Sequence, residues 1–265
     1  RVSLNATDFS MPVWDSGKIL SDKSAFIEYE GTPLKSRTTY FWQVKVWDEQ
    51  GNESDWSQPA SWHVGILSAD EWKGKWIGAP WQGEWEDKNT TPAPYFRREV
   101  CLGKKIASAV AFVTGLGYFE FYVNGEKVGN EVLVPNFTNY GKRPHLSKTN
   151  IAIEDNFRGY RVMYLTYDIT GALKQGKNAL GMIVGNGWYN THTRRWPASY
   201  GSPRMLCQIK VTYEDGSEEI IVSDESWKVK ESAIVYNDEY IGEIYDARNE
   251  NASWQNAVLR EAPAG

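Results

Sequence analysis

Apolar and polar residues alternate with a period of two along most of this chain, and the period of 3.6 residues that marks a helix is almost absent. In residues 40–46 the alternation places four large apolar side chains on one face of a predicted strand, namely Tyr40, Trp42, Val44 and Val46. The opposite face is mostly polar, which is typical of a strand between a core and solvent. The pattern therefore predicts an all-β chain in which these four residues face a core.

A tyrosine corner is predicted at the start of this strand, because Leu34 precedes Tyr40 by six residues. In Greek-key sandwiches the hydroxyl of such a tyrosine hydrogen-bonds to backbone upstream of its strand. A turn at residues 48–51 and a closing strand at residues 61–64 follow. These features together resemble a fibronectin type III domain, which we assign to residues 1–66 and expect to be incomplete at its N-terminus.

A second unit is expected after residues 67–80, which we assign to a linker and the first strand of that unit. Strand-like runs follow at residues 95–100, 108–117, 118–124, 178–188, 204–213, 218–223 and 226–230. Turn signals such as Asn124-Gly125 separate them. Residues 81–265 are therefore predicted to form a larger antiparallel sandwich.

The predicted hairpin at residues 115–129 is dense in aromatic residues, a composition that also suits a sugar platform. Phe119, Phe121 and Val123 share one face of its first strand and are predicted to be core residues. Asn-Gly between alternating residues is a strong hairpin signal that needs no ligand to explain it. We therefore interpret this hairpin mainly as scaffold.

Two short helical turns are the only helical signals that we find. Ser68 precedes the first turn, and Glu71 stands three residues later, as in a capping box. The second turn is expected in residues 168–176, with Asp168 or Thr170 as its N-cap.

Composition and charge exclude several classes of function. The chain has 265 residues, a net charge of −5 and 41% hydrophobic residues, which indicates a globular protein of about two domains. An acidic chain has no electrostatic basis for binding a phosphate backbone, so nucleic acid is not an expected partner. No run approaches the roughly 18 apolar residues of a membrane span. The first residues lack the layout of a signal peptide, and we expect the chain to be part of a longer protein.

The two cysteines, Cys101 and Cys207, each lie in an apolar, strand-like run. Free cysteine behaves as a small hydrophobic residue and is among the most buried residue types. We therefore predict two buried free thiols rather than a disulfide.

Two loops are the best candidates for a carbohydrate-binding site, because ligands usually bind on loops that a rigid frame holds. Residues 128–136 offer carboxylate and amide groups, and residues 185–190 offer glycines for close backbone approach and an indole that could stack on a sugar ring. The candidate binding residues are Asn130, Glu131, Asn136, Asn186, Trp188 and Trp196. The alternative is that the tryptophans only cover the rim of the core.

Residues 236–248 carry the carboxylates Asp238, Glu239, Glu243 and Asp246. Glycosidic hydrolysis needs two opposed carboxylates. Acidic turns are common, however, and a structural pair of Glu243 or Asp246 with Arg248 is the simpler explanation. The three histidines lack ligand spacing, so a zinc site is not expected.

Eight motifs occur in order along the chain: VWDSGKI (13–19), LKSRTTYFWQVKVWDEQGNESDWSQPASWHVGIL (34–67), WKGKWIG (72–78), YFRREV (95–100), GLGYFEFYVNGEKVG (115–129), TYDIT (166–170), NGWY (186–189) and GEIYDAR (242–248). Their ordered combination spans nearly the whole chain and resembles the bacterial α-L-rhamnosidases of glycoside hydrolase family 78.

The resemblance implies a fibronectin-like domain and then a jelly-roll (galactose-binding-like) β-sandwich, followed in the family by a catalytic (α/α)₆ barrel. The family keeps the catalytic acid and base of its inverting mechanism in that barrel, so no catalytic residue is expected here. The implied partners are the catalytic barrel of the same polypeptide and a rhamnose-containing glycan. The resemblance also implies a secreted or periplasmic location in a bacterium.

Calcium is the one candidate cofactor that the resemblance implies. In some relatives the jelly roll is a calcium-dependent rhamnose-binding module with an Asp-Asn pair after the Val-Gly of the hairpin and an Asn before a Tyr-Gly. Here those positions hold Asn130-Glu131 and Ser199, so one carboxylate is displaced and one amide is absent. Residues 144–163 are an insertion relative to those relatives and could remodel the same end of the sandwich.

We therefore expect a non-catalytic accessory and carbohydrate-binding region of an α-L-rhamnosidase, an enzyme that hydrolyses terminal α-L-rhamnose from glycans. Two alternatives stay open. The chain could be a structural and interaction spacer with no sugar binding, or it could itself hydrolyse rhamnosides through Glu243 and Asp246.

Overall fold

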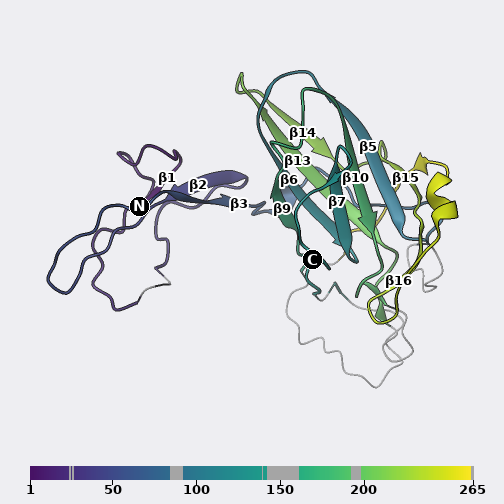
Figure 1. The fold of residues 1–265 in the computed structure, drawn as a ribbon, viewed down its shortest axis with the longest axis horizontal. Helices are drawn as coiled ribbons and strands as arrows, with labels where there is room; N and C mark the ends of the chain where they lie inside the picture. The colour runs from purple at the N-terminus through teal and green to yellow at the C-terminus, as the bar shows by residue number, and fades with distance from the viewer. Residues whose placement is uncertain are drawn as a thin grey trace. The chain divides into compact units, whose positions relative to one another are not determined.

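The computed structural model describes residues 1–23, 25, 27–83, 92–138, 140–141, 161–191 and 198–263 (Figure 1). Two compact units make up the chain, Arg1–Trp72 and Lys73–Gly265, which we call the N-terminal and C-terminal units. Almost all regular structure is β-strand, so the predicted all-β fold class is confirmed. Among the described residues, no helix is long and apolar enough to cross a membrane.

The N-terminal unit is built on one antiparallel sheet with the strand order β1-β2-β3. Its strands are β1 (Val2–Ser3), β2 (Thr38–Trp42) and β3 (Ala60–Val64). The Lys35 backbone N–H donates a hydrogen bond of 3.0 Å to the Tyr40 hydroxyl. This bond confirms the predicted tyrosine corner, in which the hydroxyl of a strand tyrosine holds the backbone that precedes the same strand.

The predicted core face of β2 is buried only at its start. Tyr40 is buried, whereas Trp42 is 38% exposed and Val46 is 64% exposed. The buried hydrophobic cluster of this unit consists of Val2, Tyr40 and Val64. The expectation that residues 42–46 also face a core is therefore wrong, because no second sheet covers this face in the described part of the unit.

The C-terminal unit is a sandwich of two larger sheets. The first has the order β18 (Gln255–Asn256), β15 (Lys228–Glu231), β5 (Pro94–Leu102), β10 (Gly176–Val184), β7 (Phe119–Val123), β8 (Glu126–Lys127). The second has the order β19 (Val258–Leu259), β4 (Ile77–Gly78), β13 (Arg204–Tyr213), β6 (Ile106–Leu116), β9 (Leu165–Asp168), and β14 (Glu218–Val222) also pairs with β13.

Shorter elements lie outside these two sheets. Two strand pairs and two 3₁₀ turns are described, namely β11 (Asn190–Thr191) with β12 (Ala198–Ser199), β16 (Ile234–Asp238) with β17 (Gly242–Tyr245), η1 (Ala69–Glu71) and η3 (Ala247–Asn251). All pairings between these strands and within both sheets are antiparallel.

The core of the C-terminal unit lies between the two sheets. Its large, fully buried side chains include Phe96, Phe121, Met182, Met205 and Trp227. Burial of a side chain of this size contributes about 1.5–3 kcal/mol of hydrophobic free energy. Such burial gives the loops of this unit a rigid frame.

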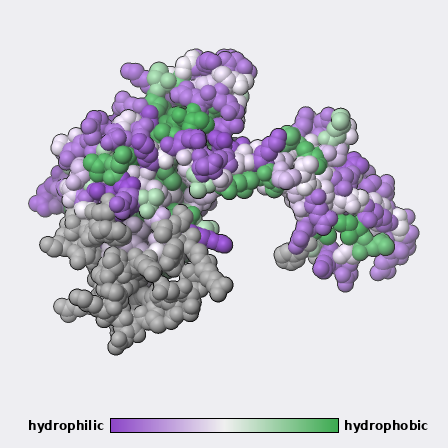
Figure 2. Space-filling model, turned by 180° about the vertical axis from the view of Figure 1, so that it is seen from behind, coloured by the Kyte–Doolittle hydropathy of each residue, from purple (hydrophilic) through white to green (hydrophobic). Residues whose placement is uncertain are grey.

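The hairpin at residues 115–129 has the inward and outward faces that its alternation predicts. Phe119, Phe121 and Val123 are all buried in the core, so their assignment is confirmed. The Asn124-Gly125 turn has positive φ at both residues, which is the conformation of a two-residue hairpin loop. Figure 2 shows that hydrophobic residues also reach the surface of both units, in patches within a mainly hydrophilic face.

Both helical-turn predictions need correction. Ser68 precedes η1 as its N-cap, but its side chain makes no capping bond, because its hydroxyl donates to Asp70. Glu71 binds Ser36 and Arg37 instead of reciprocating. Residues 169–173 form a turn rather than an assigned helix, although Asp168 accepts the expected bond from the Thr170 backbone.

Both cysteines are free, as expected, but only Cys207 is buried. Cys101 lies on the outer face of β5 and is exposed. Successive side chains of a strand point to opposite faces, and in β5 the Leu102 side chain points into the core. The prediction of a buried thiol is therefore wrong for Cys101.

Candidate functional site

Several loops meet at one end of the C-terminal sandwich, where β10 ends and β7 begins (Figure 1). The Gly185 N–H donates to the Tyr118 carbonyl at 2.7 Å, and the Phe119 N–H donates to the Val134 carbonyl at 2.8 Å. These two backbone bonds join both predicted binding loops to the same turn between β6 and β7. We call this region, built from residues 117–119, 130–138, 140–141, 185–191 and 236–240, the loop end.

Two glycines allow the backbones at the loop end to approach each other closely. Gly117 has a φ of +66°, and a Cβ there would lie 2.1 Å from the Gly185 carbonyl oxygen. Gly187 has a φ of +45°, and a Cβ there would lie 2.9 Å from the Tyr118 nitrogen. The Gly-Asn-Gly sequence thus serves the close backbone approach that the sequence predicts.

A chain of side-chain amides holds the second predicted loop in place. The Asn186 backbone N–H donates to Asn237 Oδ1 at 2.6 Å, and the Asn190 amide donates to Asn186 Oδ1 at 2.9 Å. The Ser199 hydroxyl donates to Asn190 Oδ1 at 2.6 Å. Asn186, Asn190 and Ser199 are buried. The structure therefore places Asn186 inside the loop end, where it orients the backbone, and Ser199 against it through Asn190.

Three aromatic residues form a partly exposed wall at the loop end. The Trp188 ring centroid lies 5.8 Å from that of Phe137 and 5.5 Å from that of Tyr240. Phe137 is 46% exposed and Tyr240 is 65% exposed. We call these three residues the aromatic wall. Phe137 directly follows the first predicted loop, Trp188 belongs to the second loop, and Tyr240 directly follows Glu239. The aromatic wall therefore brings these three segments together.

Buried tyrosines support the aromatic wall from the interior. Tyr140 lies 5.3 Å from both Tyr189 and Tyr200 between ring centroids, and all three are buried. Phe137 packs on Tyr140 at 6.0 Å. Because aromatic pairs of this kind have preferred geometries, Tyr140 positions Phe137, which in turn packs on Trp188.

Glu239 is the loop-end carboxylate that lies next to the aromatic wall, since it precedes Tyr240. One of its oxygens accepts a hydrogen bond from the Thr191 hydroxyl, while Oε2 is buried without a partner. Burial raises the pKa of Glu239 above its ordinary value of 4.5, and the charge of Asp238 adds to this rise. Burial also raises the pKa of the Tyr118 hydroxyl, and the charge of Glu239 acts in the same direction.

The Asn237 side chain is the second incompletely paired group beside Glu239. Its Nδ2 is buried and has no hydrogen-bond partner. Asn237 lies near the end of β16 and Glu239 in the turn that follows, and their side chains bind the Asn186 N–H and the Thr191 hydroxyl of the same loop. Unpaired buried polar atoms are uncommon in proteins, and two of them belong to the loop end.

The first predicted loop places its polar residues apart from the aromatic wall. The Tyr167 hydroxyl hydrogen-bonds to the Glu131 carboxylate, and burial together with this carboxylate raises the pKa of Tyr167 to about 12. Asn130 and Asn136 are exposed. Within the described residues, no hydrogen bond or ring contact joins Asn130 or Glu131 to Trp188. Trp196 lies outside the described residues, so the structure gives it no position.

The carboxylates of residues 238–246 serve different structural purposes. Asp238 accepts backbone hydrogen bonds from Tyr240 and Ile241 and so shapes the turn between β16 and β17. Asp246 pairs with Arg248 at 2.6 Å, which confirms one of the two predicted structural pairs. This pairing lowers the pKa of Asp246 to about 2.

No group of three or more histidine, cysteine, aspartate or glutamate side chains suited to a metal ion is present among the described residues. His63 is described, whereas His145 and His192 lie outside the described part of the chain. Calcium therefore stays a candidate cofactor that rests on the sequence resemblance.

Sequence reasoning missed most of the aromatic wall. Trp188 was a candidate, but Phe137 and Tyr240 were not, although both are large aromatic residues beside turn residues. No sequence signal identifies Thr191. Its role is a hydrogen bond from its hydroxyl to Glu239, which lies 48 residues away in the sequence.

The described residues thus define an all-β protein of two units, of which the C-terminal one is a sandwich of two antiparallel sheets. A model of the alpha-L-rhamnosidase N-terminal domain matches residues 104–154 and 155–263, and a model of the Rha78A-like N-terminal immunoglobulin domain matches residues 2–68. The first match covers more than half of the chain. The chain therefore belongs to the α-L-rhamnosidase N-terminal domain family.

Relatives and solved structures agree with this assignment. An α-L-rhamnosidase of Formosa agariphila is 38% identical over 96% of this chain and 27% of its own length. The structure of the α-L-rhamnosidase from Dictyoglumus thermophilum is 36% identical, with a TM-score of 0.78 over 96% of this chain and 28% of that one. The native enzyme of Aspergillus terreus is 28% identical, with a TM-score of 0.78 over 92% of this chain and 28% of that one.

Much of each relative lies outside the matched region. The chain spans between 25% and 39% of the length of four curated α-L-rhamnosidases that it matches. The comparisons therefore place this chain as an N-terminal region of that family.

Proposed function

We propose that this chain is a non-catalytic, carbohydrate-binding region of a secreted or periplasmic α-L-rhamnosidase, and that its loop end binds rhamnose-containing glycans. Hydrolysis of terminal α-L-rhamnose belongs, in this proposal, to a catalytic barrel on the same polypeptide. The loop end then holds the glycan close to that barrel.

The observation that carries this proposal is the aromatic wall of Phe137, Trp188 and Tyr240 beside the Glu239 carboxylate. Ligand sites are mostly apolar surfaces with a few placed polar groups. An aromatic face packs on the C–H face of a sugar ring, while the Glu239 carboxylate, which the buried Thr191 hydroxyl orients, is the polar group that binds sugar hydroxyls. Asn130, Glu131 and Asn136 lie on the neighbouring loop and extend the site along a longer glycan.

The roles of the remaining candidates differ in this proposal. Asn186 is a positioning residue, because its amide holds Asn190 and the Asn237 segment. Glu131 is the carboxylate available to calcium on the first loop, and calcium binding there competes with its hydrogen bond from Tyr167. Trp196 is a further binding residue on the strength of its sequence position.

The test compares two tryptophan variants by calorimetric titration with L-rhamnose. Trp188→Ala removes the centre of the aromatic wall, and we expect a loss of about 2 kcal/mol, or roughly 30-fold in Kd. Trp254→Ala is the matched control, because Trp254 is 37% exposed and packs on Tyr95, and neither residue belongs to the loop end. Equal affinity in both variants and the parent would exclude the aromatic wall as the site.

Asn130→Ala provides a second test on the first loop. The side chain is exposed, so its loss is expected to leave the melting temperature unchanged. A weaker affinity for L-rhamnose at constant melting temperature supports a site that extends to this loop. If L-rhamnose binds the parent with no dependence on Trp188 or Asn130, the sugar site lies elsewhere.

A further inference from the structure

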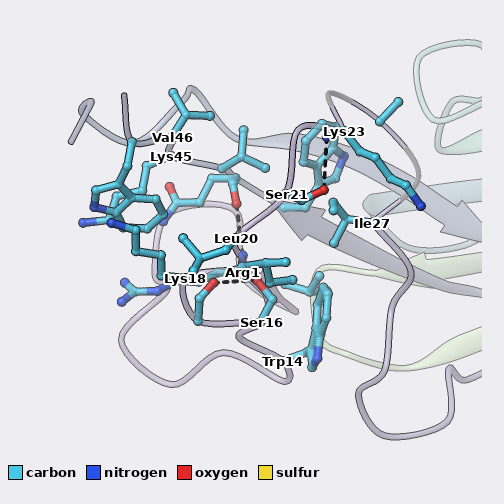
Figure 3. A pocket seen from close by; sticks show the side chains of 18 of the residues that line it. Arg1, Trp14, Ser16, Lys18, Leu20, Ser21, Lys23, Ile27, Lys45 and Val46 are labelled. Atoms are coloured by element: carbon cyan, nitrogen blue, oxygen red, sulfur yellow. Dashed lines mark hydrogen bonds between the residues drawn. The ribbon is translucent and has the colours of Figure 1, made fainter. Parts of the chain in front are cut away.

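Exposed apolar side chains occur on both units, but they differ in kind. The N-terminal unit has an open groove whose walls carry the aliphatic side chains of Leu20, Ile27 and Val46 (Figure 3). The loop end instead exposes aromatic rings, because Phe137 is 46% exposed and Tyr240 is 65% exposed. In the proposed function these rings contact the sugar, so their arrangement decides which sugar fits best.

The three rings of the aromatic wall do not share a plane. The Trp188 ring makes an angle of 45° with the Phe137 ring and 82° with the Tyr240 ring, at centroid distances of 5.8 and 5.5 Å. A sugar ring that stacks on one of these rings therefore meets a second ring at its edge rather than beneath it. The groups at that edge are the substituents of the sugar ring.

The polar end of the Trp188 indole is used inside the protein. Its N–H hydrogen-bonds to the hydroxyl of Tyr118, in the turn between β6 and β7. The exposed part of the indole and the Phe137 ring therefore offer only apolar atoms to a ligand. A substituent that packs against these atoms is itself apolar, because a hydroxyl group there would lose its hydrogen bonds to water.

Among the described residues next to the aromatic wall, few polar groups are left to recognise sugar hydroxyls. The amides of Asn186 and Asn190 and the hydroxyl of Thr191 all bond within the loop end. Two buried atoms have no partner, Glu239 Oε2 and Asn237 Nδ2. One acceptor and one donor can bind hydroxyls of several configurations, so the apolar contact determines more of the selectivity.

We propose that the loop end selects 6-deoxy sugars by their methyl group, which packs between Trp188 and Tyr240. The ligand class then includes both L-rhamnose and L-fucose, whose hydroxyls differ in configuration but which share a methyl group on C5. L-Mannose is L-rhamnose with a hydroxyl added to that methyl group, and it binds more weakly. The proposal rests on the proposed function and adds the feature of the sugar that is recognised.

Calorimetric titration of the unmodified chain with L-rhamnose, L-fucose and L-mannose, with calcium present, tests this proposal. L-Rhamnose and L-mannose differ only at C6, so the ratio of their Kd values measures the methyl contact. An apolar contact rejects an added hydroxyl only moderately, and we expect L-mannose to bind about tenfold more weakly. L-Fucose should bind with an affinity closer to that of L-rhamnose than to that of L-mannose.

Three variants test where the methyl group is bound. Tyr240→Ala should bring the Kd ratio of the two sugars close to one, by weakening L-rhamnose binding alone. Tyr245→Ala is the matched control and should keep the parent ratio, because Tyr245 lies outside the loop end and is 57% exposed. Glu239→Gln should weaken both sugars by the same factor, because both carry the hydroxyls that the carboxylate binds.

The outcomes separate this proposal from the proposed function. Equal affinity for L-rhamnose and L-mannose would overturn the proposal and leave the proposed function intact, and so would a parent ratio that persists in Tyr240→Ala. Binding of L-rhamnose without binding of L-fucose would also overturn it, because hydroxyl configuration would then decide the selectivity. Absence of binding by all three sugars would overturn the proposed function, and this proposal with it.

Discussion

The C-terminal unit encloses its apolar residues between two sheets, whereas the N-terminal unit leaves much of its apolar face open. Both units show the same period-two alternation in sequence. Phe121 on β7 is 1% exposed, but Trp42 on β2 is 38% exposed. The comparison teaches that alternation identifies the apolar face of a strand, while the presence of a covering sheet decides whether that face is a core.

The largest expected difference between the units is the cost of removing an aromatic ring. Phe121→Ala leaves a cavity in a closed core and should cost about 3–5 kcal/mol of unfolding free energy. Trp42→Ala removes a half-exposed ring and should cost less than about 1 kcal/mol in the 265-residue chain. Denaturant unfolding of both variants measures the two costs. Equal costs would mean that the N-terminal face is also closed in solution.

The tyrosine corner gives a smaller effect within the open unit. Tyr40→Phe keeps the buried ring but removes the hydrogen bond from the Lys35 N–H, so we expect a loss of about 1 kcal/mol. Tyr29→Phe is the control, because its hydroxyl donates to the Thr32 carbonyl in an exposed bond that water replaces. Thermal unfolding of both variants checks the difference. Identical melting temperatures would show that the corner does not stabilise this unit.

The loop end of the closed unit should show a pH-dependent effect at Glu239. Burial raises the folded-state pKa of Glu239 above 4.5, so the folded protein binds the proton more tightly than the unfolded chain. Its stabilising contribution is full below pH 4.5 and is lost as pH rises through the folded-state pKa. Glu239→Gln cannot ionise and should therefore raise the melting temperature at pH 7, with a gain that shrinks below pH 4.5. A gain that is constant with pH would contradict this account.

Thiol labelling of the two cysteines compares the outer surface of the C-terminal sandwich with its interior. This measurement involves no substitution and so no change in stability. Cys101 is exposed, whereas Cys207 is buried, and burial raises the pKa of the Cys207 thiol to about 12. A thiol reagent should therefore label one cysteine per folded chain and two per unfolded chain. Mass spectrometry of the labelled peptides identifies the site. Fast labelling of Cys207 in the folded protein would show that the two sheets separate readily.

Local signals allowed much of the fold to be predicted. The six-residue spacing from Leu34 to Tyr40 predicted the tyrosine corner, and Asn124-Gly125 predicted a hairpin whose inward residues are buried. The tyrosine corner and the Asn-Gly turn depend on neighbours within a few residues, so the local sequence can specify them. The burial of the inward residues also needs the second sheet that covers them.

Long-range packing was less predictable. The aromatic wall joins Phe137, Trp188 and Tyr240, which are separated by about 50 residues each, and no local pattern links them. Glu71 was expected to cap its own turn, but it binds Ser36, 35 residues away, instead. Such contacts follow from the way the loops meet, which the period of each strand does not specify.

The most direct test of the proposed function is one calorimetric titration of L-rhamnose into the unmodified chain, performed with calcium and again with a chelator. Saturable heat in the presence of calcium, lost or reduced with chelator, is the result that we predict if calcium binds at Glu131. Saturable heat in both conditions still supports a binding region, and it assigns the affinity to the aromatic wall and Glu239. Absence of heat in both conditions would contradict carbohydrate binding by this region.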